Sequence, residues 1–327
     1  MNTAVRYVNY IVPGNSVPVK NFVNAIDDAY FTGDIDRDDL VGIYRNYLGI
    51  EKIHIDEKSN ESGHFTELLN DYFSRTKTDP ADIDFIVYTR GNSISKGDPW
   101  CFDKDAGECV NTPYFLQKVF TMSNAQIFNV EQECSGTLIA TRIVLSLIRD
   151  NVAKKALILS SNFFETAIKR TMTGMSLVSD GVGIMEISRC DSSHDGYNLI
   201  DHAGMTNGAI AKVTDLVKDD NPGVIVSTGV KLLKTLVEKN GLSMNDIALI
   251  IPQNINKSGW NYYCQVLGYP IEKVFLDNCS DGHMGDVDII RNIADARKNN
   301  RLEGGAYALV YGLGTGLSWN AFLLQAC

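Results

Sequence analysis

The sequence predicts an α/β fold made of two similar halves, each containing a mostly parallel sheet. Two observations lead to this prediction. Apolar runs of strand length alternate with stretches of helical periodicity along the chain. The order strand, helix, strand, turn, helix, strand also occurs twice, which indicates an internal duplication.

The first half begins this order with a short apolar run at residues 82–88, preceded by acidic turn residues. A helix and a second strand at 125–130 follow. The turn Glu133-Cys134-Ser135-Gly136 then opens a helix with an apolar stripe, and residues 155–160 form the third strand. Strands of this kind, apolar throughout, are typical of sheets buried on both faces.

The second half repeats the order with strands at residues 245–251, 273–277 and 306–311. The turn after its second strand is Cys279-Ser280-Asp281-Gly282-His283, and the helix that it opens carries an apolar stripe. Three matching strands in the same order favour duplication over chance.

We therefore divide the chain into an N-terminal half, residues 1–170, and a C-terminal half, residues 171–327. Two such units related by a pseudo-twofold axis would pack face to face. Because ligands commonly bind beyond the carboxyl ends of parallel strands, we expect Cys134 and His283 to meet at one site near this axis.

Composition excludes several function classes. The 327 residues carry a net charge of -10, whereas a global nucleic-acid binder would be basic. No apolar run resembles a signal peptide or a membrane span, so we expect a cytoplasmic protein with no membrane association. Seven irregularly spaced cysteines without a CxxC pair argue against a disulfide framework or a metal site and leave room for a working thiol.

Cys134 follows a strand and stands at a predicted helix start. Unpaired backbone N–H groups and the positive end of the helix dipole favour its thiolate there, which is the nucleophilic form. The negative charge of Glu133 opposes this effect unless its side chain points away. The alternative is a small buried residue at a helix start, since buried free cysteines are common.

His283 lies between Gly282 and Gly285, which allow the backbone to bring the ring close to a ligand. Asp286, one turn along the following helix, would be placed to orient the ring. The alternative is a helix-capping loop with an exposed histidine. Neither alternative is favoured by the residues alone.

Two further segments carry polar groups at strand ends. Gln253 and Asn254 end a strand and would donate hydrogen bonds to a carbonyl or enolate oxygen, unless they only stabilise a turn. Residues 312–316 form a glycine turn that precedes another strand-like run at 317–324. A dinucleotide-binding fingerprint would need a helix there, so backbone N–H groups presented to an oxyanion fit better.

Four segments resemble a known family when taken together and in order. They are residues 46–58 (NYLGIEKIHIDEK), 132–136 (QECSG), 178–183 (VSDGVG) and 314–319 (GTGLSW). With these segments, nearly the whole chain resembles the ketoacyl-acyl-carrier-protein synthase III branch of the thiolase superfamily. That resemblance implies a thiolase-like fold with αβαβα layers.

The resemblance also implies functional roles. Cys134 would take an acyl group from coenzyme A or an acyl carrier protein as a thioester, and no cofactor would be bound permanently. The backbone N–H groups of Cys134 and Thr315 would form the oxyanion hole, and the protein would be a homodimer. Gln253 stands where the family has its catalytic histidine, and His283 stands where the family has its asparagine.

These departures leave two mechanisms. In the first, Gln253 or Asn254 together with His283 stabilises the enolate from malonyl-thioester decarboxylation, and condensation follows. In the second, His283 deprotonates an alcohol or amine that attacks the Cys134 thioester. The competing class is a catalytically weak or inactive partner subunit of a ketosynthase-type complex, in which Cys134 would react with iodoacetamide no faster than the other cysteines.

Residues 90–111, with Trp100 and Phe102, are longer than the usual connection and are expected to shape the acyl pocket or the dimer interface. Four basic residues are candidates for carrier-protein or coenzyme A contact, although solvated surface charge would explain each one alone. They are Lys154, Lys155, Lys169 and Arg170.

Overall fold

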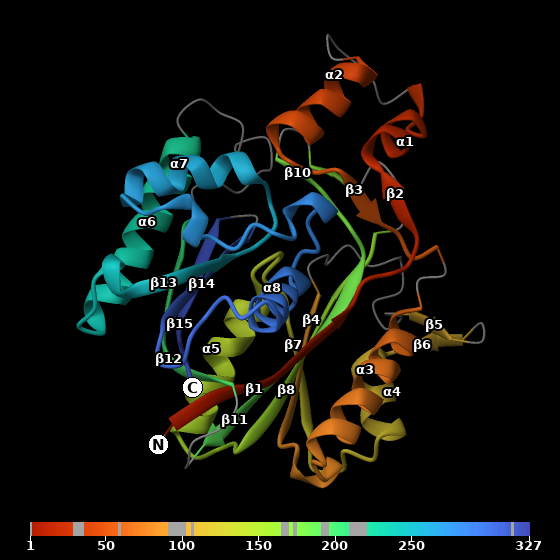
Figure 1. The fold of residues 1–327 in the computed structure, drawn as a ribbon. Coiled ribbons are helices and arrows are strands. Elements are labelled where there is room, and N and C mark those ends of the chain that lie inside the picture. The colour runs from red at the N-terminus through yellow and green to blue at the C-terminus, as the bar shows by residue number, and fades with distance from the viewer. Residues whose placement is uncertain are drawn as a thin grey trace.

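The structure is a computed structural model that describes ten segments of the chain. These are residues 2–28, 36–57, 60–90, 103–105, 108–164, 170–172, 175–190, 196–208, 221–314 and 317–327. The strands in this part of the chain form two curved groups. Helices lie between the two groups and cover the outer face of each, which gives five layers (Figure 1).

In the first group of strands four members run in the same direction and one, the fourth in spatial order, runs in the opposite direction. In spatial order they are β7 (Gln126–Val130), β4 (Phe85–Arg90), β8 (Lys155–Asn162), β11 (Gly181–Cys190) and β1 (Asn2–Ile11). The pairs β7–β4 and β4–β8 are parallel, and β8–β11 and β11–β1 are antiparallel.

The second group has the same order and directions. It consists of β13 (Ile247–Pro252), β14 (Tyr307–Gly314), β15 (Ser318–Ala326) and β12 (Tyr197–Thr206). β13 and β14 are parallel, and the next two pairs are antiparallel. A single parallel bridge between Ile250 and Val274 stands where β7 stands in the first group. This repeated topology supports the duplication.

Two residue pairs, Ala4 with Asn198 and Val5 with Tyr197, join β1 to β12, so all nine strands form one continuous sheet. Between its two parts lie α5 (Gly136–Arg149) and α8 (Val287–Lys298) (Figure 1). The outer helices are α3 (Glu61–Thr76) and α4 (Thr112–Val119) on the first part, and α6 (Asn221–Lys239) and α7 (Lys257–Leu267) on the second. The predicted αβαβα layering is confirmed.

Side-chain alternation along the strands explains the layers. On β4, Phe85 and Val87 pack against the two central helices, whereas Ile86 and Tyr88 pack against α3 and α4. A strand buried on both faces has no polar side to show, which is why its sequence reads as an uninterrupted apolar run.

A small unit near the N-terminus has its own apolar cluster. It contains β2 (Ser16–Pro18), α1 (Val19–Asn24), α2 (Arg37–Gly42), a π-helical turn (Ile43–Tyr47) and β3 (Lys52–His54). The Glu51 N–H donates to the Ser280 carbonyl at 2.8 Å, and the Asp180 N–H donates to the His54 carbonyl at 2.8 Å. The unit therefore packs against the turn that precedes His283.

Short elements complete the described chain. The strands are β5 (Asp103–Asp105), β6 (Glu108–Val110), β9 (Thr171–Met172) and β10 (Ser176–Leu177). The 3₁₀ turns are Pro80–Asp82, Met244–Asp246, Ile271–Lys273 and Cys279–Asp281. Among the described residues, no helix has the length and apolar character needed to cross a membrane.

Five of the six predicted repeat strands form, and the one at residues 273–277 does not. A 3₁₀ turn occupies Ile271–Lys273 after Pro270, and turns resume at Asp277. Only one bridge, at Val274, and the hydrogen bond from the Phe275 N–H to the Ile250 carbonyl (2.8 Å) remain for pairing. The division of the chain at residue 170 stays a prediction.

Candidate active site

The nucleophile turn connects β7 to α5, as the sequence predicts. Cys134 is half-buried two residues before the first residue of α5. Glu133 before it has a left-handed backbone with φ 47°, a conformation that a residue other than glycine rarely adopts. The Ser135 N–H donates to the Gln132 carbonyl at 3.0 Å and closes this turn. A strained turn held by its surroundings is common at functional sites.

The loop that carries His283 comes from the other half of the chain. Its flanking residues Gly282 and Gly285 have φ values of 78° and 53°, which glycine adopts without steric cost. Between them the His283 N–H donates to the Leu177 carbonyl at 2.7 Å, and its carbonyl accepts from the Ser179 N–H at 2.8 Å. The ring is 1 % exposed, so the exposed capping histidine is excluded.

The His283 ring connects a thiol to a carboxylate. Its Nδ1 lies 2.5 Å from Asp288 Oδ2, and the side chain is also hydrogen-bonded to Cys134. Burial alone would lower the pKa of His283, but the negative charges of Asp288 and of ionised Cys134 and the two hydrogen bonds raise it well above its usual value. The structure thus brings Cys134 and His283 together, as expected.

Asp288 is held as firmly as the ring that it orients. Its carboxylate accepts hydrogen bonds from the Met284 N–H (2.9 Å), the Asn254 N–H (2.8 Å) and Asn254 Nδ2 (3.0 Å). Asn254 Oδ1 in turn accepts from Asn292 Nδ2 at 2.8 Å. Asn254 therefore lies behind His283, on the Asp288 side, and fixes the carboxylate.

The sequence predicted Asp286 as the residue that orients His283, and this assignment is wrong. The prediction assumed that the helix after this loop already includes His283. Instead His283 is extended, forming a bridge with Val178, and α8 begins only at Val287. Asp286 is thereby turned towards the N-terminus of α5, while Asp288 on the first turn of α8 reaches the ring.

Gln253 links the nucleophile turn to the end of β14. Its side-chain amide donates to the Cys134 carbonyl, and its Oε1 accepts from the Leu313 N–H at 2.7 Å. β15 rather than a helix follows β14, in agreement with the rejection of a dinucleotide site. Thr315, the second expected oxyanion-hole donor, lies outside the described residues.

A cavity of about 560 Å³ opens onto Cys134 and His283. Its walls come from the π-helical turn of the N-terminal unit, β9, α6, α7 and β14, and most of them are apolar or aromatic. Among the lining residues are Leu48, Met172, Met175, Ile225, Trp260, Tyr263, Tyr311 and Leu317. The hydroxyls of Tyr263 and Tyr311 lie 2.8 Å apart in this wall. Such a cavity suits an apolar ligand whose reactive end reaches the thiol.

Comparisons with known proteins show which proteins the chain resembles. Residues 237–326 match the family described as 3-oxoacyl-[acyl-carrier-protein (ACP)] synthase III C terminal. The chain is 26% identical over 227 residues to beta-ketoacyl-[acyl-carrier-protein] synthase III of Aquifex aeolicus (strain VF5), which covers 66% of this chain and 72% of that protein. The chain is a ketoacyl synthase III-like protein.

The synthase III-like chain shares its fold with solved structures over almost its whole length. The crystal structure of 3-oxoacyl-[acyl-carrier-protein] synthase III from Aquifex aeolicus VF5 aligns with a TM-score of 0.77 at 18% identity, covering 99% of both chains. ChlB3, described as an acyltransferase, aligns with a TM-score of 0.79 at 13% identity over 100% of this chain and 98% of its own. The predicted thiolase-like fold is confirmed.

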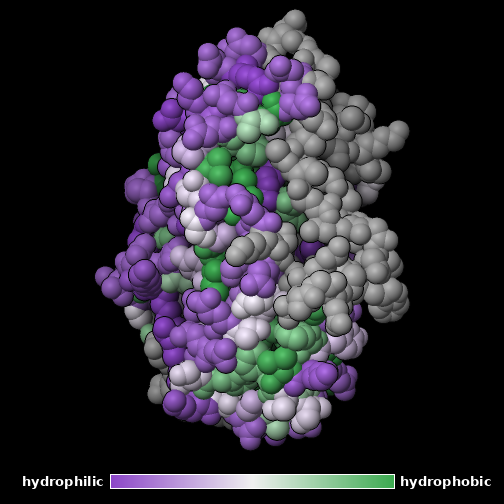
Figure 2. Space-filling view, turned by 90° about the vertical axis from the view of Figure 1, so that its right-hand side faces the viewer, coloured by the Kyte–Doolittle hydropathy of each residue, from purple (hydrophilic) through white to green (hydrophobic). Residues whose placement is uncertain are grey.

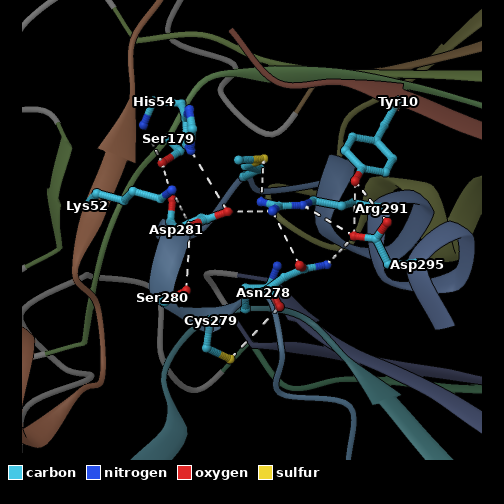
Figure 3. A network of polar contacts seen from close by, with 12 residues as sticks. Tyr10, Lys52, His54, Ser179, Asn278, Cys279, Ser280, Asp281, Arg291 and Asp295 are labelled. Atoms are coloured by element: carbon cyan, nitrogen blue, oxygen red, sulfur yellow. Dashed lines mark hydrogen bonds and ion pairs between the residues drawn. The ribbon is translucent and has the colours of Figure 1, made fainter. Parts of the chain in front are cut away.

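A polar network anchors the histidine loop of the synthase III-like protein to α8 and β1 (Figure 3). Arg291 Nη2 donates to Asp281 Oδ2 at 2.5 Å and to Asn278 Oδ1 at 3.3 Å. Asn278 Nδ2 donates to Asp295 at 2.7 Å, and the Tyr10 hydroxyl donates to the same carboxylate at 2.8 Å. The loop position therefore depends on contacts that reach the first strand.

The basic residues expected to contact a carrier or coenzyme A lie in different places. Arg170 is 3 % exposed and donates to Asp180 at 2.6 and 2.8 Å, so it is an internal ion-pair partner. Lys154 and Lys155 stand at the start of β8, and Lys155 Nζ donates to Thr78 at 3.1 Å. Ser160, further along the same strand, contacts Thr137 near the nucleophile turn. The start of β8 is roughly 16 Å from Ser160, by the usual rise per residue of a strand. The structure does not bring these three residues to the cavity.

Several expectations lie outside the described residues. They concern Lys169, Trp100, Phe102 and the backbone N–H group of Thr315. The role given to residues 90–111 in the acyl pocket or dimer interface stays a prediction for the same reason.

Proposed function

We propose that this protein transfers acyl groups through a thioester on Cys134, with His283 as the general base and Asp288 as the residue that orients it. The observation that carries this proposal is the His283 ring, which is hydrogen-bonded to the thiol on one side and to the carboxylate on the other. Nucleophile, base and orienting acid in this order form the arrangement by which many enzymes activate a weak nucleophile.

In the first half-reaction the Cys134 proton passes to His283, and the sulfur attacks the carbonyl carbon of an acyl thioester. The bond between this carbon and the donor sulfur breaks, and the donor leaves as a thiol with the proton from His283. Asp288 stabilises the imidazolium while it exists. Backbone N–H groups at the nucleophile turn would stabilise the oxyanion.

In the second half-reaction an acceptor hydroxyl or amine gives its proton to His283 and attacks the Cys134 thioester. The carbon–sulfur bond breaks, the acyl group leaves on the acceptor, and the imidazolium returns its proton to the sulfur. The side-chain amides of Gln253 and Asn254 support transfer rather than condensation, because they donate to the Cys134 carbonyl and to Asp288. Neither contact stabilises an enolate.

The donor follows from the cavity and the relatives. The apolar wall beside Cys134 suits an acyl chain or an apolar acceptor. The Aquifex aeolicus relative is named beta-ketoacyl-[acyl-carrier-protein] synthase III, and we propose an acyl-CoA or acyl-carrier-protein thioester as the donor here.

The decisive measurement is the intact mass of the protein after incubation with a panel of acyl-CoA and acyl-carrier thioesters. We expect a gain of one acyl group in the wild type with at least one donor and no gain in Cys134→Ala. Addition of hydroxylamine, a small amine nucleophile, should then return the wild type to its original mass and release a hydroxamate.

A Cys264→Ala variant is the matched control, because Cys264 is buried in α7 and its burial raises the pKa of the thiol to about 11. It should acylate like the wild type. If no donor adds mass, the proposal fails, and the inactive partner subunit of a ketosynthase-type complex becomes the better account.

We further propose that the protein is a homodimer that pairs through β7. This strand ends the sheet among the described strands, and an open strand edge is a template for another chain. Tyr114 and Val119 on the neighbouring α4 are 54% and 48% exposed, and hydrophobic patches interrupt the surface on the right-hand side of Figure 1 (Figure 2). Sedimentation velocity should give twice the chain mass; a monomer at micromolar concentration would refute the dimer.

A further inference from the structure

Asp286 is a buried carboxyl group that the proposed reaction does not use. It is 0 % exposed and immediately precedes α8, between His283 and Asp288. Its side chain does not face the His283 ring but points to the beginning of α5, the helix that follows Cys134. A buried ionisable group at this position affects both reacting residues.

The contacts of Asp286 with α5 are direct. Its Oδ1 accepts from the Thr137 N–H at 3.3 Å, whereas its Oδ2 is buried without a hydrogen-bond partner among the described residues. In return, the Thr137 hydroxyl donates to the Asp286 main-chain carbonyl at 2.8 Å. The first N–H groups of a helix have no partner within the helix and attract an anion. Here a carboxylate from the other half of the chain accepts from one of them.

Gly136 shows how close this contact is. A Cβ atom at this position would lie 2.4 Å from Asp286 Oδ2, well inside van der Waals distance. A residue larger than glycine would therefore displace the carboxyl group. The close approach of Asp286 to the helix start thus depends on this glycine, two residues after the nucleophile.

Hydroxyl groups complete the surroundings of the carboxyl group. Ser160 Oγ lies 2.6 Å from Thr137 Oγ1 and accepts from Thr89 Oγ1 at 2.8 Å. Burial raises the pKa of Asp286 to about 7, although the hydrogen bond from the Thr137 N–H and the charge of His283 oppose the rise. The group therefore changes its charge near neutral pH.

We propose that Asp286 is a positioning residue that controls the ionisation of the Cys134–His283 pair by occupying the N-terminus of α5. When Asp286 is ionised, its charge cancels the positive end of the helix and repels a thiolate at Cys134. When it is protonated, this opposition is lost. The same negative charge favours the imidazolium form of His283.

Among the described residues, His283 is the charged group that acts on the Asp286 carboxyl, and other titratable residues of the site stand on the two segments that meet here. Cys134 and Glu133 lie on the nucleophile turn, His283 on the same loop and Asp288 on the first turn of α8. β4 and β8 contribute the hydroxyls of Thr89 and Ser160, and α5 contributes its backbone. Protonation of Asp286 thus changes the local charge by one unit beside the reacting pair.

Asp286→Asn tests this proposal, because the amide oxygen can still accept from Thr137 while the charge is gone. The rate of Cys134 alkylation by iodoacetamide, followed by peptide mass at a series of pH values, should show a midpoint about one pH unit lower in the variant, since a like charge has been removed. Cys327, an exposed cysteine just after β15, provides an internal reference whose alkylation profile should not change.

Two further variants serve as a control and as a second test. Asp277→Asn removes a surface carboxylate that pairs with Arg301 at 3.2 Å and should leave the alkylation profile unchanged. Asp286→Ser removes the same charge with a smaller polar side chain, so the alkylation midpoint should fall as in Asp286→Asn. This variant decides the matter if Asp286→Asn does not fold.

An unchanged profile in folded Asp286→Asn, or an equal shift in Asp277→Asn, would overturn the proposal. It rests on the proposed function only in treating Cys134 as the nucleophile. Alkylation needs no acyl donor, so the two ideas can fail separately. A shifted midpoint in a protein that never takes an acyl group would retain the role of Asp286 and reject acyl transfer.

Discussion

Replacement of His283 by alanine should slow acylation of Cys134 by about 10²–10⁴-fold, the usual contribution of a positioned general base. The reason is that the ring contacts both Cys134 and Asp288, so its loss removes the base and leaves the carboxylate without its partner. The measurement is the rate of acyl-mass gain with the donor preferred by the wild type. Added imidazole should restore part of the lost rate, because the variant leaves a space of the same shape.

His64→Ala is the matched control. His64 also contacts a carboxylate, with Nε2 2.8 Å from Asp56 Oδ2, but it lies on α3 and does not line the cavity at Cys134. This variant should acylate at the wild-type rate. A His283→Ala protein that folds and acylates within threefold of the wild type would remove His283 from the mechanism.

Asp180→Asn should destabilise the fold by about 3–5 kcal/mol, since it leaves the Arg170 guanidinium buried without its counter-charge. The two side chains are 1 % and 3 % exposed and joined by two hydrogen bonds. The carboxylate also accepts from the Asp56 N–H at 2.8 Å and the Phe164 N–H at 3.1 Å, so its geometry is fixed on several sides. The expected fall in the apparent Tm is on the order of 10 °C.

The exposed pair of Arg45 and Glu51 provides the comparison. Their side chains are 49% and 53% exposed at a distance of 2.8 Å, and such surface pairs contribute little. Glu51→Gln should therefore change the apparent Tm by no more than about 2 °C. Equal shifts in the two variants would show that the buried ion pair does not stabilise the protein as argued.

Much of the fold follows from local patterns in the sequence. Strands such as β4 and β13 are buried on both faces, so their apolar runs are unambiguous. The failed strand at residues 273–277 has a similar composition but lies at the edge, where a single bridge to Ile250 is all that forms. Composition alone does not distinguish an edge segment from an interior strand.

The candidate site was predictable to the extent that its residues follow strand ends. Cys134 and His283 were found in this way, because duplicated halves place equivalent turns near one axis. Asp288 was missed, because the choice between it and Asp286 depends on the residue at which α8 begins. The available signal was Asp288, five residues after His283, together with Asn254 after β13. This signal can be interpreted only when the geometry of the loop is known.

The place of β1 in the sheet has a consequence for the order in which the chain folds. β1 lies between β11 and β12, and Asn2 pairs with Cys190. Until residues 181–206 have been synthesised, β1 has neither neighbour, and both of its edges are open to wrong partners. Long-range pairing of this kind gives a high contact order and slow folding. A nascent chain halted before residue 181 should therefore depend on chaperones, however stable the finished protein is.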